Sequence, residues 1–181
     1  MLQPHILIDR VYAGQDTARE ILLAHSRQVA TMAVAIARRL VARGEPVDVN
    51  FVEQAAWLHD IGVLYTRAPS IGCFGPAPYI RHGVIGARML NRAGLRRHGL
   101  VCERHIGVGL SANDIRQQQL PLPRRDMVPL TVEEEIVAFA DLFFSKTSPD
   151  KKLPEKIRLS LARHDVGKVT QFDAWLSRFG E

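Results

Sequence analysis

The sequence predicts an all-α protein, a single bundle of about seven or eight helices. Apolar residues recur at helical spacing in one segment after another, and several of these segments follow a Ser, Thr or Asn with an acidic residue three positions later. The apolar–polar alternation of strands is nearly absent. No repeat, low-complexity tract or linker divides the 181 residues, which are enough for one domain with a substantial core.

The first segment, 1–14, is too short to classify and could be a helix or an extended arm. A long helix is expected from Asp16 to Gly44, with Thr17 and Glu20 as its capping box.

After the break at Pro46, Asn50 and Glu53 are expected to cap a second helix, which ends near residue 58. Residues 63–79 hold three prolines and two glycines, so they are predicted to form a loop, and a plausible lid, beside any site there.

The second half of the chain continues the helical pattern. Ser111 with Asp114, and Thr131 with Glu134, have the spacing of helix caps. The remaining helices are expected over 79–93, 95–106, a short stretch after 111, 131–144, 154–161 and about 171–179.

Composition and charge restrict the function classes. The chain is 46% hydrophobic and 24% charged, with no apolar run long enough to cross a membrane and no leader-like start, so a cytoplasmic protein is expected. The net charge of +5 suits an anionic substrate. The basic residues are scattered in pairs with few aromatics between them, so nucleic acid is not the expected partner. Two widely spaced cysteines fit a reducing compartment, and a homodimer is left open.

The stretch 55–62 is the strongest chemical signal in the chain. An apolar run ends in His59 and Asp60, and Gly62 then allows the backbone to turn. A buried carboxylate beside an imidazole requires a metal ion, an ion pair or a hydrogen-bond network. A second such pair, His164 and Asp165, follows polar residues and is interpreted as a helix end, with Lys168 near the C-terminal dipole.

Two distant residues support a metal site at the first pair. His25 is expected to face inward from the long helix, and Asp141 interrupts the apolar face of the helix over 131–144. Four crossing helices could bring His25, His59, Asp60 and Asp141 together, a nitrogen and oxygen ligand set suited to Fe, Mn, Co, Ni or Zn.

The order His, His-Asp, Asp along the chain, together with the stretch 58–62, resembles the HD superfamily of metal-dependent phosphohydrolases. The resemblance covers about residues 20–147. It implies a single HD domain over 1–181, with the C-terminal helices 154–181 packed on it. His82 and His105 resemble the extra histidines of binuclear members such as the diadenosine tetraphosphate hydrolase type and the HD-GYP proteins. By this resemblance one or two divalent metal ions bind, two being favoured. By the same resemblance, His25, His59, Asp60 and Asp141 bind one metal ion, and Asp60 also binds a second ion together with His82 and His105.

The resemblance implies hydrolysis of a phosphate ester or anhydride of a nucleotide or dinucleotide by a metal-bridging hydroxide, with Asp60 as the catalytic residue. Arg67, Arg81 and Lys146 are the candidates for binding substrate phosphate. Val63 and the absence of Gly-Tyr-Pro argue against a cyclic dinucleotide substrate, and the chain is most similar to small uncharacterised HDIG-domain proteins. The alternatives are a mixed-valence di-iron oxygenase and a non-catalytic signalling module.

Residues that fit no site are assigned by their surroundings. His5 and His98 are expected to be exposed, whereas Trp57, Phe143 and Phe144 are expected in the core.

Overall fold

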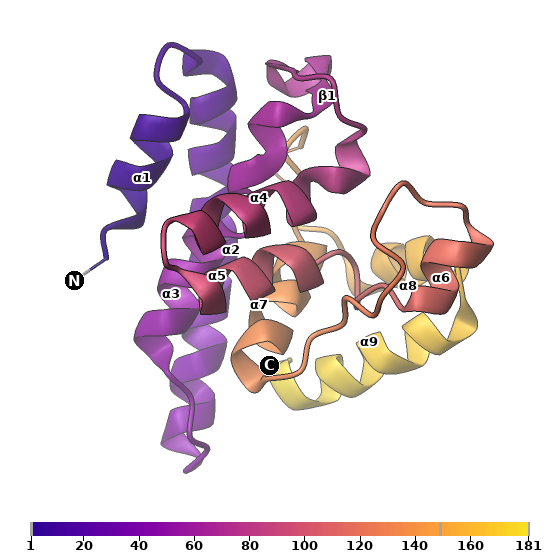
Figure 1. Ribbon diagram of the computed structural model, residues 1–181. Coiled ribbons are helices and arrows are strands. Elements are labelled where there is room, and N and C mark those ends of the chain that lie inside the picture. The colour runs from indigo at the N-terminus through magenta and orange to yellow at the C-terminus, as the bar shows by residue number, and fades with distance from the viewer. Residues whose placement is uncertain (1, 149, 181) are drawn as a thin grey trace.

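The computed structural model describes residues 2–148 and 150–180, and nine α-helices account for most of them (Figure 1). This confirms the all-α prediction. The ninth helix is α1, in the segment that the sequence left unclassified, and Pro4 at its start has the fixed backbone angle that suits a first helical residue. The helices are α1 (Pro4–Val11), α2 (Asp16–Ala42), α3 (Val49–Leu58), α4 (His82–Arg92), α5 (Arg96–Arg104), α6 (Ala112–Gln117), α7 (Val132–Leu142), α8 (Pro154–Ala162) and α9 (Val166–Phe179).

The predicted loop over 63–79 is more regular than expected. Three short 3-10 helices surround an antiparallel two-stranded ladder in which Arg67 pairs with Phe74 and Ala68 with Cys73. These elements are η1 (Ile61–Tyr65), β1 (Arg67–Ala68), η2 (Pro69–Ile71), β2 (Cys73–Phe74) and η3 (Tyr79–Arg81). The helix expected from residue 79 therefore begins at 82, after η3.

Two of the four predicted helix caps are confirmed. The hydroxyls of Ser111 and Thr131 accept hydrogen bonds from the backbone N–H groups of Asp114 and Glu134, at 3.0 Å and 3.3 Å. Such bonds satisfy N–H groups that have no partner within the helix.

The other two cap predictions are wrong. Helix α2 already includes Thr17, and its first turn carries Asp16, whose negative charge suits the positive end of the helix dipole. Helix α3 is capped by Asp48 rather than Asn50, and the Asp48 carboxylate accepts the N–H of Phe51 at 2.9 Å.

The second His-Asp pair lies between helices α8 and α9. Asp165 caps α9 by accepting the N–H of Gly167 at 2.7 Å, and both Asp165 and His164 are exposed. The last helix consequently starts at 166 rather than near 171. Lys168 lies in the first turn of α9, where it pairs with Asp114 at 2.9 Å, so its predicted position near a helix C-terminus is wrong.

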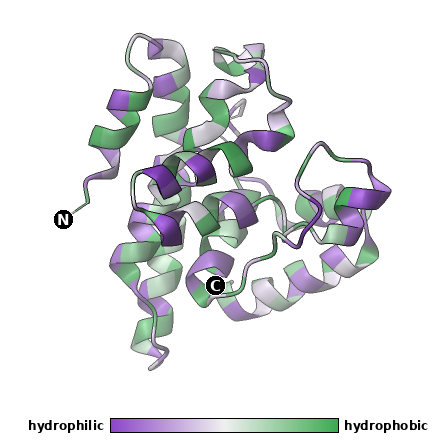
Figure 2. Cartoon of the chain, in the orientation of Figure 1, coloured by the Kyte–Doolittle hydropathy of each residue, from purple (hydrophilic) through white to green (hydrophobic). Residues whose placement is uncertain are grey.

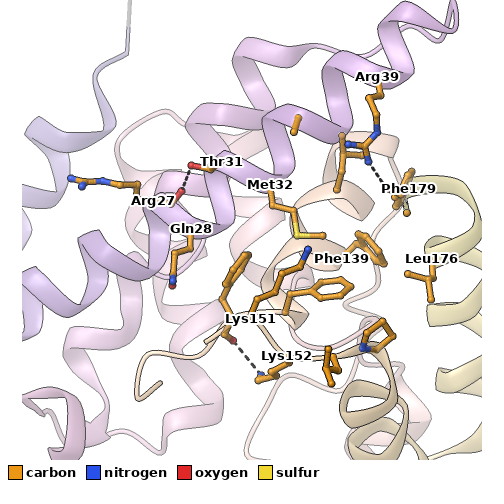
Figure 3. Close-up of a pocket in the computed structure, with 17 residues that line it drawn as sticks. Arg27, Gln28, Thr31, Met32, Arg39, Phe139, Lys151, Lys152, Leu176 and Phe179 are labelled. Atoms are coloured by element: carbon orange, nitrogen blue, oxygen red, sulfur yellow. Dashed lines mark hydrogen bonds between the residues drawn. The ribbon is translucent and has the colours of Figure 1, made fainter. Parts of the chain in front are cut away.

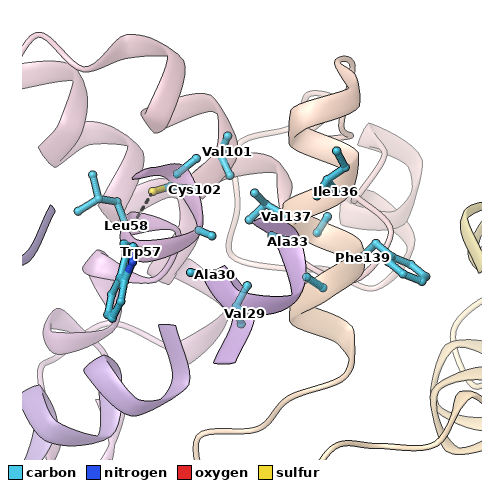
Figure 4. Packing of buried hydrophobic residues seen from close by; sticks show 14 of the residues in the cluster. Val29, Ala30, Ala33, Trp57, Leu58, Val101, Cys102, Ile136, Val137 and Phe139 are labelled. Atoms are coloured by element: carbon cyan, nitrogen blue, oxygen red, sulfur yellow. Dashed lines mark hydrogen bonds between the residues drawn. The ribbon is translucent and has the colours of Figure 1, made fainter. Parts of the chain in front are cut away.

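The core lies where α2, α3 and α7 pack together (Figure 4). Small side chains of α2, such as Ala30 and Ala33, allow close approach of the neighbouring helices, and Val137 of α7 lies beside Ala33. Colouring by hydropathy shows apolar and polar residues interspersed along most helices, as amphipathic helices around one core require (Figure 2). None of the described helices combines the length and the apolar character needed to span a membrane.

Trp57 and Phe143 are buried as expected and Phe144 is partly buried. His5 is exposed, as predicted. The prediction that His98 is exposed is wrong: its side chain packs edge-on against Phe51, and its Nε2 lies 3.2 Å from Oε1 of Gln54. An apolar ring and an amide on the neighbouring helix together bury it.

Candidate metal centre

Five helices contribute to one buried cluster of four histidines and two aspartates. His25 lies within α2, while His59 and Asp60 immediately follow α3. His82 is the first residue of α4, His105 follows α5, and Asp141 belongs to the last turn of α7. All six predicted ligand residues therefore meet, and only the Asp141 side chain, 22% exposed, reaches the surface.

One oxygen of Asp60 faces the first group of ligand atoms. Its Oδ2 lies 3.1 Å from Nε2 of His25 and 3.0 Å from Nε2 of His59. Oδ1 of Asp141 lies 3.0 Å and 3.4 Å from the same two nitrogens. These four ligand atoms lie within 4.8 Å of one another, a separation that one metal ion can span.

The other oxygen of Asp60 faces a second group. Its Oδ1 lies 3.3 Å from Nε2 of His82 and 3.6 Å from Nε2 of His105, and those two nitrogens are 3.1 Å apart. Asp60 is thus shared between two neighbouring sets of ligand atoms, which is the geometry that a bridging carboxylate requires.

Backbone carbonyls fix the orientation of three of the rings. Because a carbonyl can only accept, each Nδ1 must donate its hydrogen, which leaves the Nε2 lone pair directed into the cluster when the ring is neutral. The acceptor lies three residues earlier in each case: Ala56 for His59 at 2.7 Å, Tyr79 for His82 at 2.7 Å, and Cys102 for His105 at 2.8 Å. His25, within a long helix whose carbonyls are already bonded, has no hydrogen-bond partner for its Nδ1.

Asp60 is fully buried, and neither of its carboxylate oxygens makes a hydrogen bond of good geometry. Its compensation comes from an ion pair with the ammonium of Lys146, which also lies 3.5 Å from Nε2 of His25, and from the surrounding imidazoles. An ionised carboxylate in a dry interior is costly unless cations surround it, so this donor set fits divalent metal ions.

The electrostatics of the cluster favour ionised carboxylates. Burial would raise the pKa of Asp60, but Lys146 and His59 hold it well below its usual value. Burial would likewise lower the pKa of His59, yet the two carboxylates outweigh burial and raise this pKa to about 10. Burial lowers the pKa of His82, and it lowers that of His105 to about 3. His82 and His105 are therefore neutral at pH 7, the form that binds metals.

Gly62 explains how the second group of ligands reaches Asp60. A Cβ atom at this position would lie 2.3 Å from the carbonyl oxygen of His82 and 2.4 Å from the backbone nitrogen of Gly86. Since real Cβ atoms do not approach other atoms so closely, only glycine allows η1 to lie directly against the first turns of α4. That contact places His82 beside Asp60.

A cavity of about 630 Å³ opens onto the cluster at His25 and Asp141. Tyr79 and Lys146 line it next to the ligands, and α8 contributes the facing wall. The sequence singled out no residue of α8, because its basic residues have the pattern of an ordinary solvated helix face.

Of the three predicted phosphate-binding residues, only Lys146 lines this cavity. Arg67 is exposed on β1 and Arg81 ends η3, and their roles stay predictions.

A larger cavity, of about 810 Å³, contains none of the six ligand residues. It lies between α2, α7 and the C-terminal helices, and Met32, Phe139 and Leu176 line its apolar interior (Figure 3). Arg39 crosses one end and donates to the carbonyl of Phe179 at 2.7 Å.

Comparison with known proteins gives a family and several relatives, among them the following three. The model of the HD domain matches residues 22–144. An uncharacterised protein of Methanocaldococcus jannaschii is 36% identical over 123 residues, which cover 67% of this chain and 65% of that protein. The tRNA (cytidine(56)-2'-O)-methyltransferase of Thermoplasma volcanium is 36% identical over 137 residues, and that of Picrophilus torridus 32% over 127. These matches cover 75% and 70% of this chain but only 34% and 32% of the methyltransferases. No solved structure matches the chain.

Proposed function

The chain belongs to the HD-domain family of metal-dependent phosphohydrolases, and from that premise we propose that it hydrolyses a phosphate ester or anhydride of a nucleotide or dinucleotide at two divalent metal ions. The observation that carries the proposal is the position of Asp60. It is fully buried and directs one oxygen to each of two groups of imidazoles. Two cations in such a site lower the pKa of a shared water and stabilise the charge that develops on the phosphoryl oxygens.

The protein side chains have distinct tasks in this proposal. Asp60 would hold both cations, and the Nδ1–H bonds to backbone carbonyls direct the Nε2 atoms of His59, His82 and His105 to where the cations would bind. Lys146, between the cluster and the cavity, binds and orients a phosphate oxygen as a point charge. The apolar helices behind the cluster exclude bulk water, which strengthens each of these interactions.

The methyltransferase activity in the names of two relatives is not proposed for this chain. This chain matches about one third of the length of each of those enzymes, and it spans about two thirds of the Methanocaldococcus protein. Residues 22–144, which match the HD-domain model, contain the six clustered histidines and aspartates, whose chemistry suits metal binding and hydrolysis.

The test is phosphate release by the purified, metal-loaded protein on a panel of mononucleotides and dinucleotides. Wild type should hydrolyse at least one compound, and Asp60→Asn should lower kcat/KM by more than about 100-fold because neither cation is then held. Asp165→Asn is the matched control: it changes the other His-Asp pair, which caps a helix, and should keep full activity.

Activity that is equal in wild type and Asp60→Asn, or absent across the panel, would contradict hydrolysis. Retained iron together with O₂ consumption and a mixed-valence electron paramagnetic resonance signal would support the oxygenase alternative. Protein that retains no metal when metal is supplied would instead support a non-catalytic module.

A further inference from the structure

Helix α8 forms one wall of the cavity beside the metal cluster. The wall that carries His25, Tyr79 and Asp141 lies within the matched residues 22–144, whereas α8 (Pro154–Ala162) lies beyond them. The side of the cavity opposite the metal ligands is therefore built by a part of the chain outside the shared domain. Such a wall can select a substrate without changing the ligand set.

The α8 wall carries a cationic stripe. Lys156 and Ser160 of α8 line the cavity together with Arg163, which directly follows α8 with helical backbone angles, and their spacing of four and three positions places them on one face. At 1.5 Å per residue, Lys156 and Arg163 are separated by about 10 Å along the helix axis. The stripe is thus long enough to contact a substrate group some distance from the metal ligands.

The charges of this stripe have no partner within the described residues. Neither Lys156 nor Arg163 is in an ion pair, whereas Arg158, also on α8 but not lining the cavity, lies 2.7 Å from Asp173. Lys156 also lies in the first turn of α8, where the positive end of the helix dipole disfavours a cation. Among the described residues that line the cavity, Asp141 is the only acidic one, and it belongs to the cluster. The side chains of Lys156 and Arg163 are both exposed and free to pair with an anion bound in the cavity.

The lining also includes apolar side chains from both walls, among them Leu142, Phe144 and Leu159. Leu159 lies between the charged residues of the stripe, and its apolar side chain is 66% exposed. Apolar surface next to separated cations suits a carbon skeleton that carries anionic groups better than it suits an inorganic polyphosphate, which is charged along its whole length.

We propose that α8 binds a second phosphate of the substrate, so that the substrate class is an organic compound with two phosphate groups on one carbon skeleton. One phosphate reacts at the metal cluster, and Lys156 and Arg163 bind the other. This inference rests on the proposed phosphohydrolase function and specifies its substrate class.

Binding of matched probe pairs to the metal-loaded protein tests the proposal. Hexyl phosphate is compared with hexane-1,6-diyl bisphosphate, and adenosine 5'-monophosphate with adenosine 3',5'-bisphosphate, by calorimetry, with metal content measured before and after. We expect the bisphosphate of at least one pair to bind about tenfold or more tightly than its monophosphate, and salt to reduce this preference. The double variant with Lys156→Gln and Arg163→Gln should bind both members of the pair equally. Arg158→Gln, a charge change on the same helix outside the cavity, should retain the preference.

The outcomes separate the two proposals. Metal-dependent binding of a monophosphate that is lost in Asp60→Asn supports the phosphohydrolase site by itself, and the absence of such binding contradicts that site. Equal affinity within both pairs in wild type, or a preference that survives in the double variant, overturns the role of α8 and leaves the metal site intact.

Discussion

Asp60 is the one residue on which both groups of ligands depend. His59 beside it faces only the first group, whereas the two Asp60 oxygens face different groups, at 3.0 to 3.1 Å on one side and 3.3 to 3.6 Å on the other. The adjacent residues His59 and Asp60 thus have different roles, because only Asp60 faces both groups. The same dipeptide at His164 and Asp165 caps a helix and has no such role.

The number of metal ions bound by variants should reveal these different roles of Asp60 and the histidines. We expect wild type to bind two ions, His105→Ala to bind one, and Asp60→Asn to lose high affinity for both, since only Asp60 contacts both groups. Elemental analysis of protein dialysed against limiting free metal measures this. His98→Ala serves as the control, because that histidine is buried away from the cluster. Loss of both ions in His105→Ala would show that the two groups do not bind separately.

Metal affinity should increase with pH. Because the pKa of His59 is raised to about 10, its ring carries a proton at neutral pH that must leave before the nitrogen binds a metal. The apparent affinity for Zn²⁺ should rise by up to about tenfold per pH unit between pH 6 and 8. The pKa of His105, about 3, lies too low to contribute in this range. Titration against a chelator of known pH dependence measures the slope, and a flat profile would contradict it.

At the scale of elements, the contact between η1 and α4 determines where the second group of ligands lies. Gly62 lies against the backbone of the first turns of α4, and Gly83 and Gly86 bring the same helix close to Cys102 of α5. At Gly62 and Gly83 the backbones approach so closely that any side chain would prevent the contact, whereas at Gly86 a Cβ would be only a tight fit.

Gly62→Ala should therefore destabilise the protein by about 3 kcal/mol or prevent folding, because a Cβ at 2.3 Å from a backbone oxygen cannot be relieved by a side-chain rotation. Gly94→Ala is the matched control. No atom lies within 4 Å of its Cβ position, and its positive φ of 77° alone should cost about 1 kcal/mol. Denaturant unfolding compares the two, and equal losses would refute the steric argument.

Sequence reasoning succeeded where a residue pattern has a local physical cause. Helical periodicity predicted the helices, and the caps at Ser111 and Thr131 were found because their hydroxyls bond to N–H groups three residues away. Inward-facing positions and a family resemblance predict six metal-ligand residues, and the structure brings these six residues together, while their binding of metal stays a prediction. The α8 wall was missed because periodicity shows which face of a helix is polar but not which cavity that face lines. The burial of His98 was missed because it depends on Gln54 and Phe51 of another helix.

At the scale of the whole molecule, the cluster joins α2, α3, α4, α5 and α7 at one buried point. These helices carry most of the core, so metal ions bound there would link elements that are otherwise held by apolar packing. Ligands that bind only the folded state stabilise it by mass action.

Removal of metal should consequently lower the melting temperature. At a free metal concentration about 100 times Kd, binding contributes about 2.7 kcal/mol, which corresponds to about 5 to 10 °C for a chain of this size. Thermal unfolding with and without chelator measures the difference, and Asp60→Asn should show almost none. A wild-type Tm that does not respond to chelator would contradict metal binding at the cluster.

The ligands are also spread along the chain from His25 to Asp141. No short segment contains the complete set, so the cluster can form only after distant parts of the chain have come together, late in folding. Interactions absent from the folding transition state slow unfolding without speeding folding. Bound metal should therefore prolong the lifetime of the folded protein while leaving its folding rate unchanged, and stopped-flow kinetics would show a shift in the unfolding limb alone.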